Sequence, residues 1–395
     1  MTNYALASST WDENEYAAIQ RVIDSDMFTM GKEVAQYEKD FSTFFGSKYA
    51  LMVSSGSSAN LLMIAALFFT KNSKYKLKRG DEIIVPAVSW STTYFPLQQY
   101  GLNVKFVDID RQTLNMDLDK LEAAITDKTK AILSVNLLGN PNDYARMNGI
   151  IKGSDIFVLE DNCESMGATI EGKQAGTFGV MGTFSSFFSH HMATMEGGCV
   201  VTDDEELYHI LLCIRAHGWT RNLPKFNRVS GEKSEDSFEE AFKFMLPGYN
   251  ARPLEMSGAL GIEQLKKLPG FIKNRQKNAG LFKELFSEHP HLEIQKETGE
   301  SSWFGFSLVI KEGAPFNRRQ LVKLLTDNGI ECRPIVTGNF LKNKEVLEYF
   351  DYEVSGNIEN SEYIDENGLF VGNHQNIIFK EIKLLAKTLE VSDQG

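Results

Sequence analysis

The chain has few cysteines and no pairing pattern among them. Only four cysteines occur in 395 residues, and none forms a CxxC pair. The sequence therefore predicts neither a disulfide framework nor a zinc site. We expect all four to be reduced thiols (Cys163, Cys199, Cys213 and Cys332), with Cys199 and Cys213 acting as small buried apolar residues.

A long apolar run and a net positive charge are also lacking. The longest apolar stretch, Leu61 to Phe69, is too short to cross a bilayer, and the N-terminal residues lack the basic and apolar segments of a signal peptide. The formal net charge is -12, which disfavours nonspecific binding to nucleic acid or acidic membranes because no overall positive field attracts phosphates. We expect a cytoplasmic protein that binds neither nucleic acid nor membrane.

The middle of the sequence alternates between strand and helix signals. From Lys48 to about Val201, short β-rich runs bounded by Gly, Pro, Asn or Asp alternate with helical stretches; the clearest are IIVPAV, VKFVDID, AILSVNLLG and DIFVLED. This pattern predicts an α/β domain with a mainly parallel sheet buried under helices.

An amphipathic helix is predicted ahead of this domain, over residues 13–25. Its apolar residues recur at helical spacing: Tyr16, Ile19, Val22 and Ile23. A loop follows from Asp26 to Gly31.

A smaller α+β domain is predicted at the C-terminal end. Four apolar residues alternate there as in a half-buried strand: Phe304, Phe306, Leu308 and Ile310. Asn317 can cap a helix that ends before Gly329. We place the large domain at residues 1–260 and the smaller one at 261–395, in keeping with usual domain sizes.

Three runs carry candidate chemistry, and the first is SSGSSAN at residues 54–60. It leads directly into the apolar stretch at 61–69, so free backbone N–H groups lie at a helix N-terminus, where a phosphate is favoured. Ser and Gly also cap helices well, so helix capping alone remains an alternative.

The second run, LEDNCESMGA at residues 159–168, follows a predicted strand. Open α/β sheets gather their ligands at this edge. Asp161 can keep a pyridine nitrogen protonated, as pyridoxal phosphate (PLP) requires when it acts as an electron sink. Alternatively, Asp161 and Glu164 cap a following helix.

The third run, at residues 182–198, contains the pair His190 and His191. Paired histidines suggest a metal site, but adjacent side chains diverge in an extended chain and no other histidine lies at ligand spacing. No metal is expected, and a core or surface histidine is the other alternative.

In this order, the three runs resemble the DegT/DnrJ/EryC1 family of sugar aminotransferases, which act on nucleotide-linked 4-keto-6-deoxy sugars. The resemblance extends through residues 248–252. In that family the third run reads roughly T-F-S-F-Y-x-x-K, then five residues, then E-G-G. Without gaps, residues 183–185 match its start, residues 196–198 match its end, and the lysine falls on His190. The resemblance implies the PLP-dependent aspartate aminotransferase fold (fold type I), with a mainly parallel mixed sheet.

The missing lysine changes the chemistry that the resemblance implies. A transaminase needs this lysine to bind PLP covalently and to move a proton. Imidazole cannot form that bond, yet it can act as a general base near pH 7. Within the family, His at this position marks the 3-dehydratases of deoxysugar pathways, so His190 is the predicted catalytic base.

The resemblance also implies site residues. The predicted cofactor-binding residues are Gly56, Ser57, Trp90, Asp161, Glu164, Ser185 and Asn250, with Asn250 reaching across a homodimer. The predicted substrate-binding residues are Asp26, Met27, Phe28, Thr29, His217, Arg221, Arg252 and Glu331. Arginine suits a diphosphate because its planar fork donates paired hydrogen bonds. Alternatives remain: Trp90 as plain core, Asn250 as a turn residue, or any one arginine as a surface ion-pair residue.

The implied activity is removal of the C3 hydroxyl from a GDP-linked 4-keto-6-deoxymannose. The segments that carry this similarity include MFTMG, VPAVSWSTTY and RAHGWTRNLP. The cofactors expected are PLP and its amino form, pyridoxamine phosphate, with L-glutamate as co-substrate. Two alternatives remain: a nucleotide-sugar 4-aminotransferase that uses another lysine, and a non-catalytic nucleotide-sugar binding protein.

Overall fold

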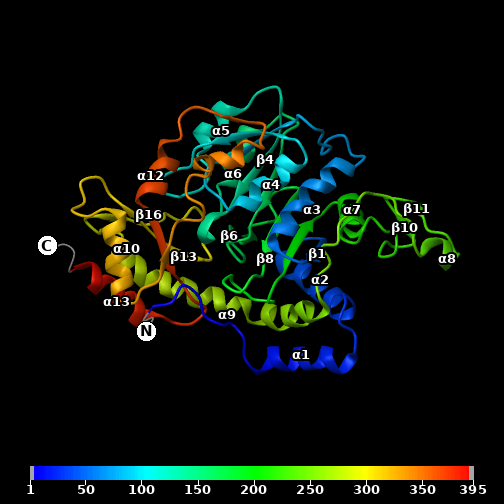
Figure 1. Ribbon diagram of the computed structural model, residues 1–395, viewed down its shortest axis with the longest axis horizontal. Helices are drawn as coiled ribbons and strands as arrows, with labels where there is room; N and C mark the ends of the chain where they lie inside the picture. The colour runs from blue at the N-terminus through cyan, green and yellow to red at the C-terminus, as the bar shows by residue number, and fades with distance from the viewer. Residues whose placement is uncertain (1–3, 391–395) are drawn as a thin grey trace.

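A twisted eight-stranded sheet forms the centre of the computed structural model, which describes residues 4–390 (Figure 1). Its strands lie in the order β1 (Tyr49–Val53), β9 (Gly198–Thr202), β8 (Met181–Ser185), β5 (Phe157–Asp161), β4 (Thr129–Val135), β2 (Glu82–Pro86), β3 (Asn103–Val107) and β15 (Tyr352–Val354). Only β9 runs antiparallel to its neighbours. The mainly parallel sheet is therefore confirmed, with the four β-rich runs as β2, β3, β4 and β5.

Helices cover both faces of this sheet. One face packs against α3 (Gly56–Phe69), α4 (Ser91–Gln99) and α7 (Glu205–Arg215), and the other against α5 (Leu118–Ala124), α6 (Tyr144–Ile150), α2 (Lys32–Phe45) and α9 (Glu255–Phe286). Successive residues of β2 alternate between these layers: Ile83 and Val85 join the core under α3, whereas Ile84 joins the core under α5. The apolar run at 61–69 lies in α3, which is buried on nearly all sides.

The predicted first helix has the bounds that its pattern indicated, Glu13–Ser25 (α1). The prediction of its buried face was partly wrong, because Tyr16 and Ile23 are exposed. Glu15 is buried in their place, since Lys267 Nζ lies 2.6 Å from its Oε2 and compensates its charge. Part of the apolar surface of α1 is thus left outside the core of the chain.

The C-terminal part contains a second, antiparallel sheet. Its strands lie in the order β12 (Leu292–Glu293), β13 (Gly305–Ile310), β16 (Gly368–Gly372) and β14 (Cys332–Arg333), with helices α10 (Arg318–Asp327), α11 (Lys344–Leu347), α12 (Glu359–Asn367) and α13 (Phe379–Glu390) around it. As predicted, Asn317 caps α10. The prediction that this strand is half-buried was wrong, because β13 is buried on both faces. Phe306 packs with residues of α9, and Val309 packs with Leu137, which follows β4 of the large sheet.

A projecting arm is the third feature of the chain. Residues 221–245 leave the body after α7 and form a short hairpin, β10 (Phe226–Asn227) with β11 (Gly231–Glu232), followed by α8 (Ser237–Glu240) (Figure 1). A second hairpin, β6 (Thr169–Ile170) with β7 (Lys173–Gln174), stays against the body. None of the helices in residues 4–390 has the length and apolar character needed to cross a membrane.

The predicted division after residue 260 falls inside α9, which runs unbroken from the large sheet to the second one. In addition, β15 comes from the C-terminal part and pairs with β3. The two-domain boundary stays a prediction, with α9 shared by both parts.

Candidate active site

Several predicted site residues meet at one edge of the large sheet. Ser185 ends β8 and Asp161 ends β5, and these two strands are neighbours, with Asp161 in register with Thr183. Because both strands end at the same edge, their last side chains lie close together.

The N-terminus of α3 lies against Ser185. A Cβ built on Gly56 would be 2.7 Å from Ser185 Cβ, so only glycine fits at that position. Ser55 caps the helix by accepting the N–H of Ser58 at 3.0 Å, and Ser57 Oγ lies 2.8 Å from Thr92 Oγ1. The first N–H groups of a helix have no acceptor within it, so this turn presents donors next to hydroxyl groups, an arrangement that suits a phosphate. Ser55 does cap the helix, as the alternative for this run predicted, but capping does not explain why Gly56 packs so closely against Ser185.

The Asp161 carboxylate is held from three sides. Its Oδ2 accepts hydrogen bonds from Asn60 Nδ2 at 2.8 Å and Thr93 Oγ1 at 2.7 Å, and its Oδ1 accepts the backbone N–H of Cys163 at 3.2 Å. Residues 162–168 form turns, so the alternative in which Asp161 and Glu164 cap a following helix is wrong. The carboxylate is buried and fixed in orientation, ready to pair with a positively charged group.

Glu164 lies behind Asp161 with a strongly shifted acidity. Burial, followed by the negative charge of Asp161, raises the pKa of Glu164 to about 7. Its Oε2 accepts the backbone N–H of Leu138 at 3.0 Å. Near neutral pH this carboxyl group therefore exists both protonated and ionised.

The two histidines differ in their surroundings. His191 is fully buried, and its Nε2 lies 3.1 Å from the carbonyl oxygen of Ser302. His190 is only partly buried, and its Nδ1 has no hydrogen-bond partner within residues 4–390. Its ring meets Phe304 edge-on at 5.2 Å between ring centroids. Nδ1 of His191 also has no partner among the described residues, so the two rings differ in their burial and in the contact of His191 with Ser302.

The charge state of His190 follows from its environment. Burial, followed by the positive charge of Arg275, lowers its pKa to about 4. At neutral pH the ring is uncharged, which is the form that can accept a proton.

Trp90 lies at the rim of this site. It immediately precedes α4, whose first residues include Thr92 and Thr93, the partners of Ser57 and Asp161. Its side chain is 57% exposed, so the alternative that Trp90 is plain core is wrong.

The predicted substrate residues form a second group beside the start of α3. The N–H of Ser54 donates to the carbonyl of Ala251 at 3.0 Å, so the segment that carries Asn250 and Arg252 passes beside the residue two positions before α3. Arg252 Nε donates to Asn250 Oδ1 at 2.9 Å, and its Nη2 lies 3.3 Å from His217 Nε2.

The loop at residues 26–29 joins this group from the other side. The N–H of Glu255 donates to the carbonyl of Phe28 at 3.1 Å, and Thr29 forms a β-bridge with Leu254. Asp26 and Met27 complete the loop after α1, and both are exposed.

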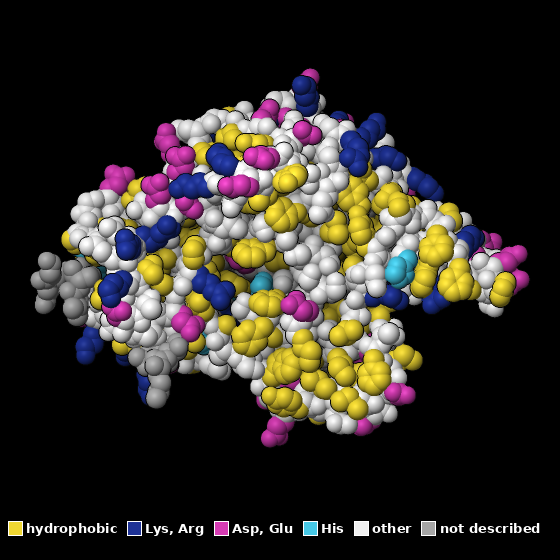
Figure 2. All heavy atoms as spheres, viewed as in Figure 1, with side chains coloured by type: hydrophobic (Ala, Val, Ile, Leu, Met, Phe, Trp, Pro, Cys, Tyr) yellow, Lys and Arg dark blue, Asp and Glu magenta, His cyan; other side chains and the backbone are white. Residues whose placement is uncertain are grey.

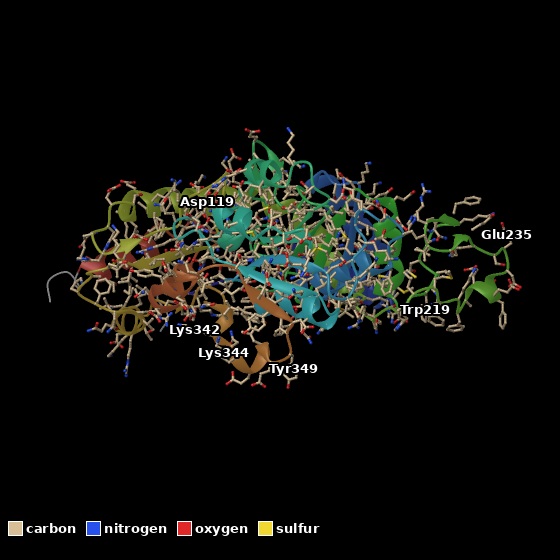
Figure 3. All side chains as sticks on the ribbon, turned by 90° about the horizontal axis from the view of Figure 1, so that it is seen from above. Asp119, Trp219, Glu235, Lys342, Lys344 and Tyr349 are labelled. Carbon is tan, nitrogen blue, oxygen red and sulfur yellow. The ribbon has the colours of Figure 1, made fainter. Side chains whose placement is uncertain are left out.

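Arg221 links the group of His217 and Arg252 to the projecting arm, whereas Glu331 lies apart from this group. The guanidinium of Arg221 lies 4.5 Å over the ring of Trp219, whose ring is 4.8 Å from that of His217. Trp219 lies at the base of the arm and Glu235 near its tip (Figure 3). Glu331 Oε2 accepts the N–H of Leu6 at 2.9 Å, so the structure groups Glu331 with the N-terminal segment.

Residues 9–390 match the DegT/DnrJ/EryC1/StrS aminotransferase family. The chain belongs to this family. A relative from Yersinia pseudotuberculosis, named GDP-4-keto-6-deoxy-D-mannose 3-dehydratase, is 73% identical over 390 residues, which cover 99% of each chain.

Solved structures show the same likeness. The structure of the E. coli GDP-4-keto-6-deoxy-D-mannose-3-dehydratase with bound hydrated PLP is 70% identical, with a TM-score of 0.97, over 98% of this chain and 100% of that one. A structure of a GDP-4-keto-6-deoxymannose-3-dehydratase that holds a trapped PLP-glutamate geminal diamine has the same identity, TM-score and coverage. The fold is therefore that of the family's PLP-dependent enzymes.

Several residues that support the predicted site residues were not predicted from the sequence motifs. Asn60 and Thr93 fix Asp161, Thr92 reaches Ser57, and Phe304 packs on His190. Asn60 lies one helical turn after Gly56, and the two threonines closely follow the predicted cofactor residue Trp90, so all three lie near predicted residues in the sequence. Phe304 does not, because it is more than a hundred residues from His190.

Proposed function

We propose that this chain is a PLP- and glutamate-dependent GDP-4-keto-6-deoxy-D-mannose 3-dehydratase. It removes the C3 hydroxyl and gives GDP-4-keto-3,6-dideoxy-D-mannose, 2-oxoglutarate and ammonia, on the route to colitose in O-antigen lipopolysaccharide. Glutamate supplies the electrons that the loss of the hydroxyl consumes. The observation that carries the proposal is His190, a neutral imidazole that falls, by the gap-free match of the third run, where the aminotransferases of the family have lysine. The 4-aminotransferase alternative is not favoured, because relatives at 73% and 70% identity are 3-dehydratases.

The residues present fit PLP. Gly56 leaves space beside Ser185 that a Cβ would fill, and the first turn of α3 offers its N–H groups there together with the hydroxyl of Ser57. These groups would hold the phosphate, joined by Asn250 from the second copy of a dimer. Asp161 would pair with the ring nitrogen, Trp90 would stack on the ring, and Glu164 would lie near the ring oxygen. When bound, PLP carries the amino group from glutamate and stores electrons during elimination.

The chain's own residues supply positioning and proton transfer. His190 is uncharged near neutral pH, so its imidazole would act as the base that takes the proton from C4′, the carbon attached to the cofactor ring. Asn60 and Thr93 keep the Asp161 carboxylate aimed into the site. Because no lysine binds the cofactor covalently, we expect it to be released by dialysis under mild conditions.

The second group of residues suits a nucleotide sugar. Arg252 and Arg221 would contact the diphosphate of GDP, with His217 between them and the loop Asp26–Thr29 beside them. Glu331 is assigned to the substrate by the resemblance alone, because its Oε2 binds the N-terminal segment at Leu6. These assignments follow the family pattern and stay proposals.

A homodimer with shared active sites is part of the proposal. Large apolar side chains are exposed on two surfaces beside the substrate group, namely α1 with its following loop and the arm (Figure 2). Those on α1, the loop and Leu254 are Tyr16, Ile23, Met27, Phe28 and Leu254, and those on the arm are Phe226, Phe238, Phe242, Phe244 and Met245. Exposed apolar surface of this extent is typical of an interface. We propose that a second copy of the chain covers both surfaces.

The proposed location is the cytoplasm. All four cysteines are unpaired, and disulfides are rare in cytoplasmic proteins.

The test of function uses the purified chain with PLP, glutamate and GDP-4-keto-6-deoxymannose. We expect release of ammonia and formation of a 3-deoxy sugar, measured by an ammonia assay and mass spectrometry. A stable 4-amino sugar as sole product contradicts the proposal. Borohydride reduction followed by peptide mapping is the independent check, because a pyridoxyl-lysine peptide identifies an aminotransferase. Thermal shifts with GDP, CDP and dTDP test the choice of nucleotide.

A further inference from the structure

Arg275 is a buried guanidinium that pairs with no carboxylate among residues 4–390. It lies in α9 with its side chain 3% exposed. Its Nη1 donates to three backbone carbonyls, those of Trp303 at 3.3 Å, Phe304 at 3.0 Å and Asn373 at 2.8 Å. A buried cation without a counter-charge destabilises the folded state. We therefore expect Arg275 to have a role other than stabilising the fold.

Two of the three carbonyls that Arg275 binds, those of Trp303 and Phe304, belong to a strained segment, Ser302–Phe304. Trp303 has a φ of 49°, a left-handed conformation that is costly for a bulky residue. The segment is held on its other side by the turn at Leu138 and Gly139, because Ser302 N donates to Gly139 O at 2.9 Å and Phe304 N donates to Leu138 O at 3.1 Å. Arg275 and this turn together fix the segment.

The same segment forms the wall behind the histidine pair. The Ser302 carbonyl lies 3.1 Å from Nε2 of His191, and the Phe304 ring lies 5.2 Å from the His190 ring. The His190 ring contacts the rings of Phe304 and Phe187, and packing against them helps to orient it. The position of His190 therefore depends on a segment that Arg275 holds.

The charge of Arg275 acts on the same imidazole. The titratable groups that act on His190 or interact with it are Arg275 on α9 and His191 beside it. Of the charges that act on His190, that of Arg275 is the one that lowers its pKa, after burial. The same charge lowers the pKa of His191.

We propose that Arg275 is a positioning residue for the base: its guanidinium, which pairs with no carboxylate among the described residues, fixes the segment Ser302–Phe304 against His190 and adds a positive charge that acts on the imidazole. This inference rests on the proposed function, in which His190 takes a proton. Arg275 itself contacts neither substrate nor cofactor in this proposal.

The test compares Arg275→Gln, which removes the charge but keeps N–H donors, with Arg275→Lys, which keeps the charge. Lys273→Gln is the matched control, because it removes an exposed positive charge from the same helix. The His190 titration is followed by NMR of histidine labelled at the ring carbons, with His190→Asn used to assign the signal. The pH dependence of kcat is measured in parallel with substrate and glutamate.

We expect Arg275→Gln to move the His190 titration, and the acid limb of the kcat profile, upward by about one pH unit, since a like charge no longer opposes protonation. Arg275→Lys should keep the wild-type midpoint but lower kcat at least about tenfold with little change in KM, as expected when orientation is lost. Lys273→Gln should change neither.

Three results overturn the inference: a His190 titration near 6.5 in the wild-type enzyme, an unchanged titration in Arg275→Gln, or an equal shift in Lys273→Gln. If Arg275→Gln does not fold, Arg275→Lys decides, and full kcat in that variant rejects the positioning role. The titration is read without turnover. A wild-type enzyme that forms no 3-deoxy sugar therefore rejects the proposed function while leaving the Arg275 test in force.

Discussion

Gly56 and Ser185 meet at the candidate phosphate site with no space for a side chain between them, since a Cβ on Gly56 would lie 2.7 Å from Ser185 Cβ. Gly56→Ala should therefore push Ser185 or the first turn of α3 out of place and weaken PLP binding at least about tenfold, because phosphate contacts depend on close backbone approach. Absorbance titration with PLP measures the affinity. Gly280→Ala, in α9 with open space around it, is the control and should keep wild-type affinity.

His190→Asn should retain cofactor binding and lose turnover. Removing a general base lowers kcat by roughly 10² to 10⁴. The variant should still bind pyridoxamine phosphate, measured by absorbance, and stall before ammonia is released. His209→Asn, which alters a histidine on α7, should keep wild-type kcat; full turnover by His190→Asn would remove His190 from the mechanism.

Thr93→Val tests the support of Asp161. The Thr93 hydroxyl donates to Asp161 Oδ2 at 2.7 Å, and valine has nearly the same shape without the donor. A hydrogen bond to a charged group contributes about 1.5–3 kcal/mol, so kcat should fall roughly 10- to 100-fold. Thr326→Val, on the exposed side of α10, provides the comparison. Equal kcat in the two variants means that Thr93 does not support Asp161.

Glu164→Gln should change how the stability of the apo enzyme depends on pH. The pKa of Glu164 rises from an ordinary value of 4.5 to about 7 on folding, so the folded state binds the proton more tightly. Its contribution to the free energy of unfolding is complete below pH 4.5 and is lost as the pH rises to about 7.

Glutamine imitates the protonated form at every pH. At pH 8 the variant should be more stable than the wild type by about 1–3 kcal/mol, with no gain at pH 4, as measured by urea unfolding. A gain of the same size at both pH values contradicts the assignment.

The proposed dimer predicts a strong effect of a charge on the arm. Phe238 is 88% exposed in the single chain, and burying such a side chain contributes about 2 kcal/mol, so Phe238→Asp should weaken dimerisation at least about 30-fold. Sedimentation equilibrium measures this change. Tyr349→Asp is the control, since Tyr349 is also exposed but lies on another side of the molecule (Figure 3). An unchanged dimer in Phe238→Asp places the interface elsewhere.

The sequence predicted helices, caps and strands correctly where residues within the same element determine them. The bounds of α1, the cap of α10 and the four central strands all follow from spacing, capping residues and β-rich runs. Burial was harder to predict. Tyr16 and Ile23 look like core residues by their period, but Glu15 is buried instead, because Lys267, far along the chain, neutralises it.

Within the candidate site, the motif residues at strand ends were found and their supports were not. Asp161 and Ser185 lie at the same edge because β5 and β8 are adjacent and parallel; the pattern predicted the strand end at Asp161, whereas Ser185 came only from the family resemblance. Arg275 and Phe304 reach His190 only through the fold of α9 and the 302–304 segment. A buried arginine that binds carbonyl groups leaves no pattern in its neighbours in sequence.

Helix α9 belongs to two cores at once: Leu265 and Leu268 pack beneath the large sheet with α2, and Phe282 and Phe286 pack beneath the second sheet. Melting either core exposes one end of the same unbroken helix, so neither half keeps its full complement of contacts when the other is lost. The chain should therefore unfold in a single calorimetric transition, and it should not yield two independently folding fragments when it is cut within residues 255–286.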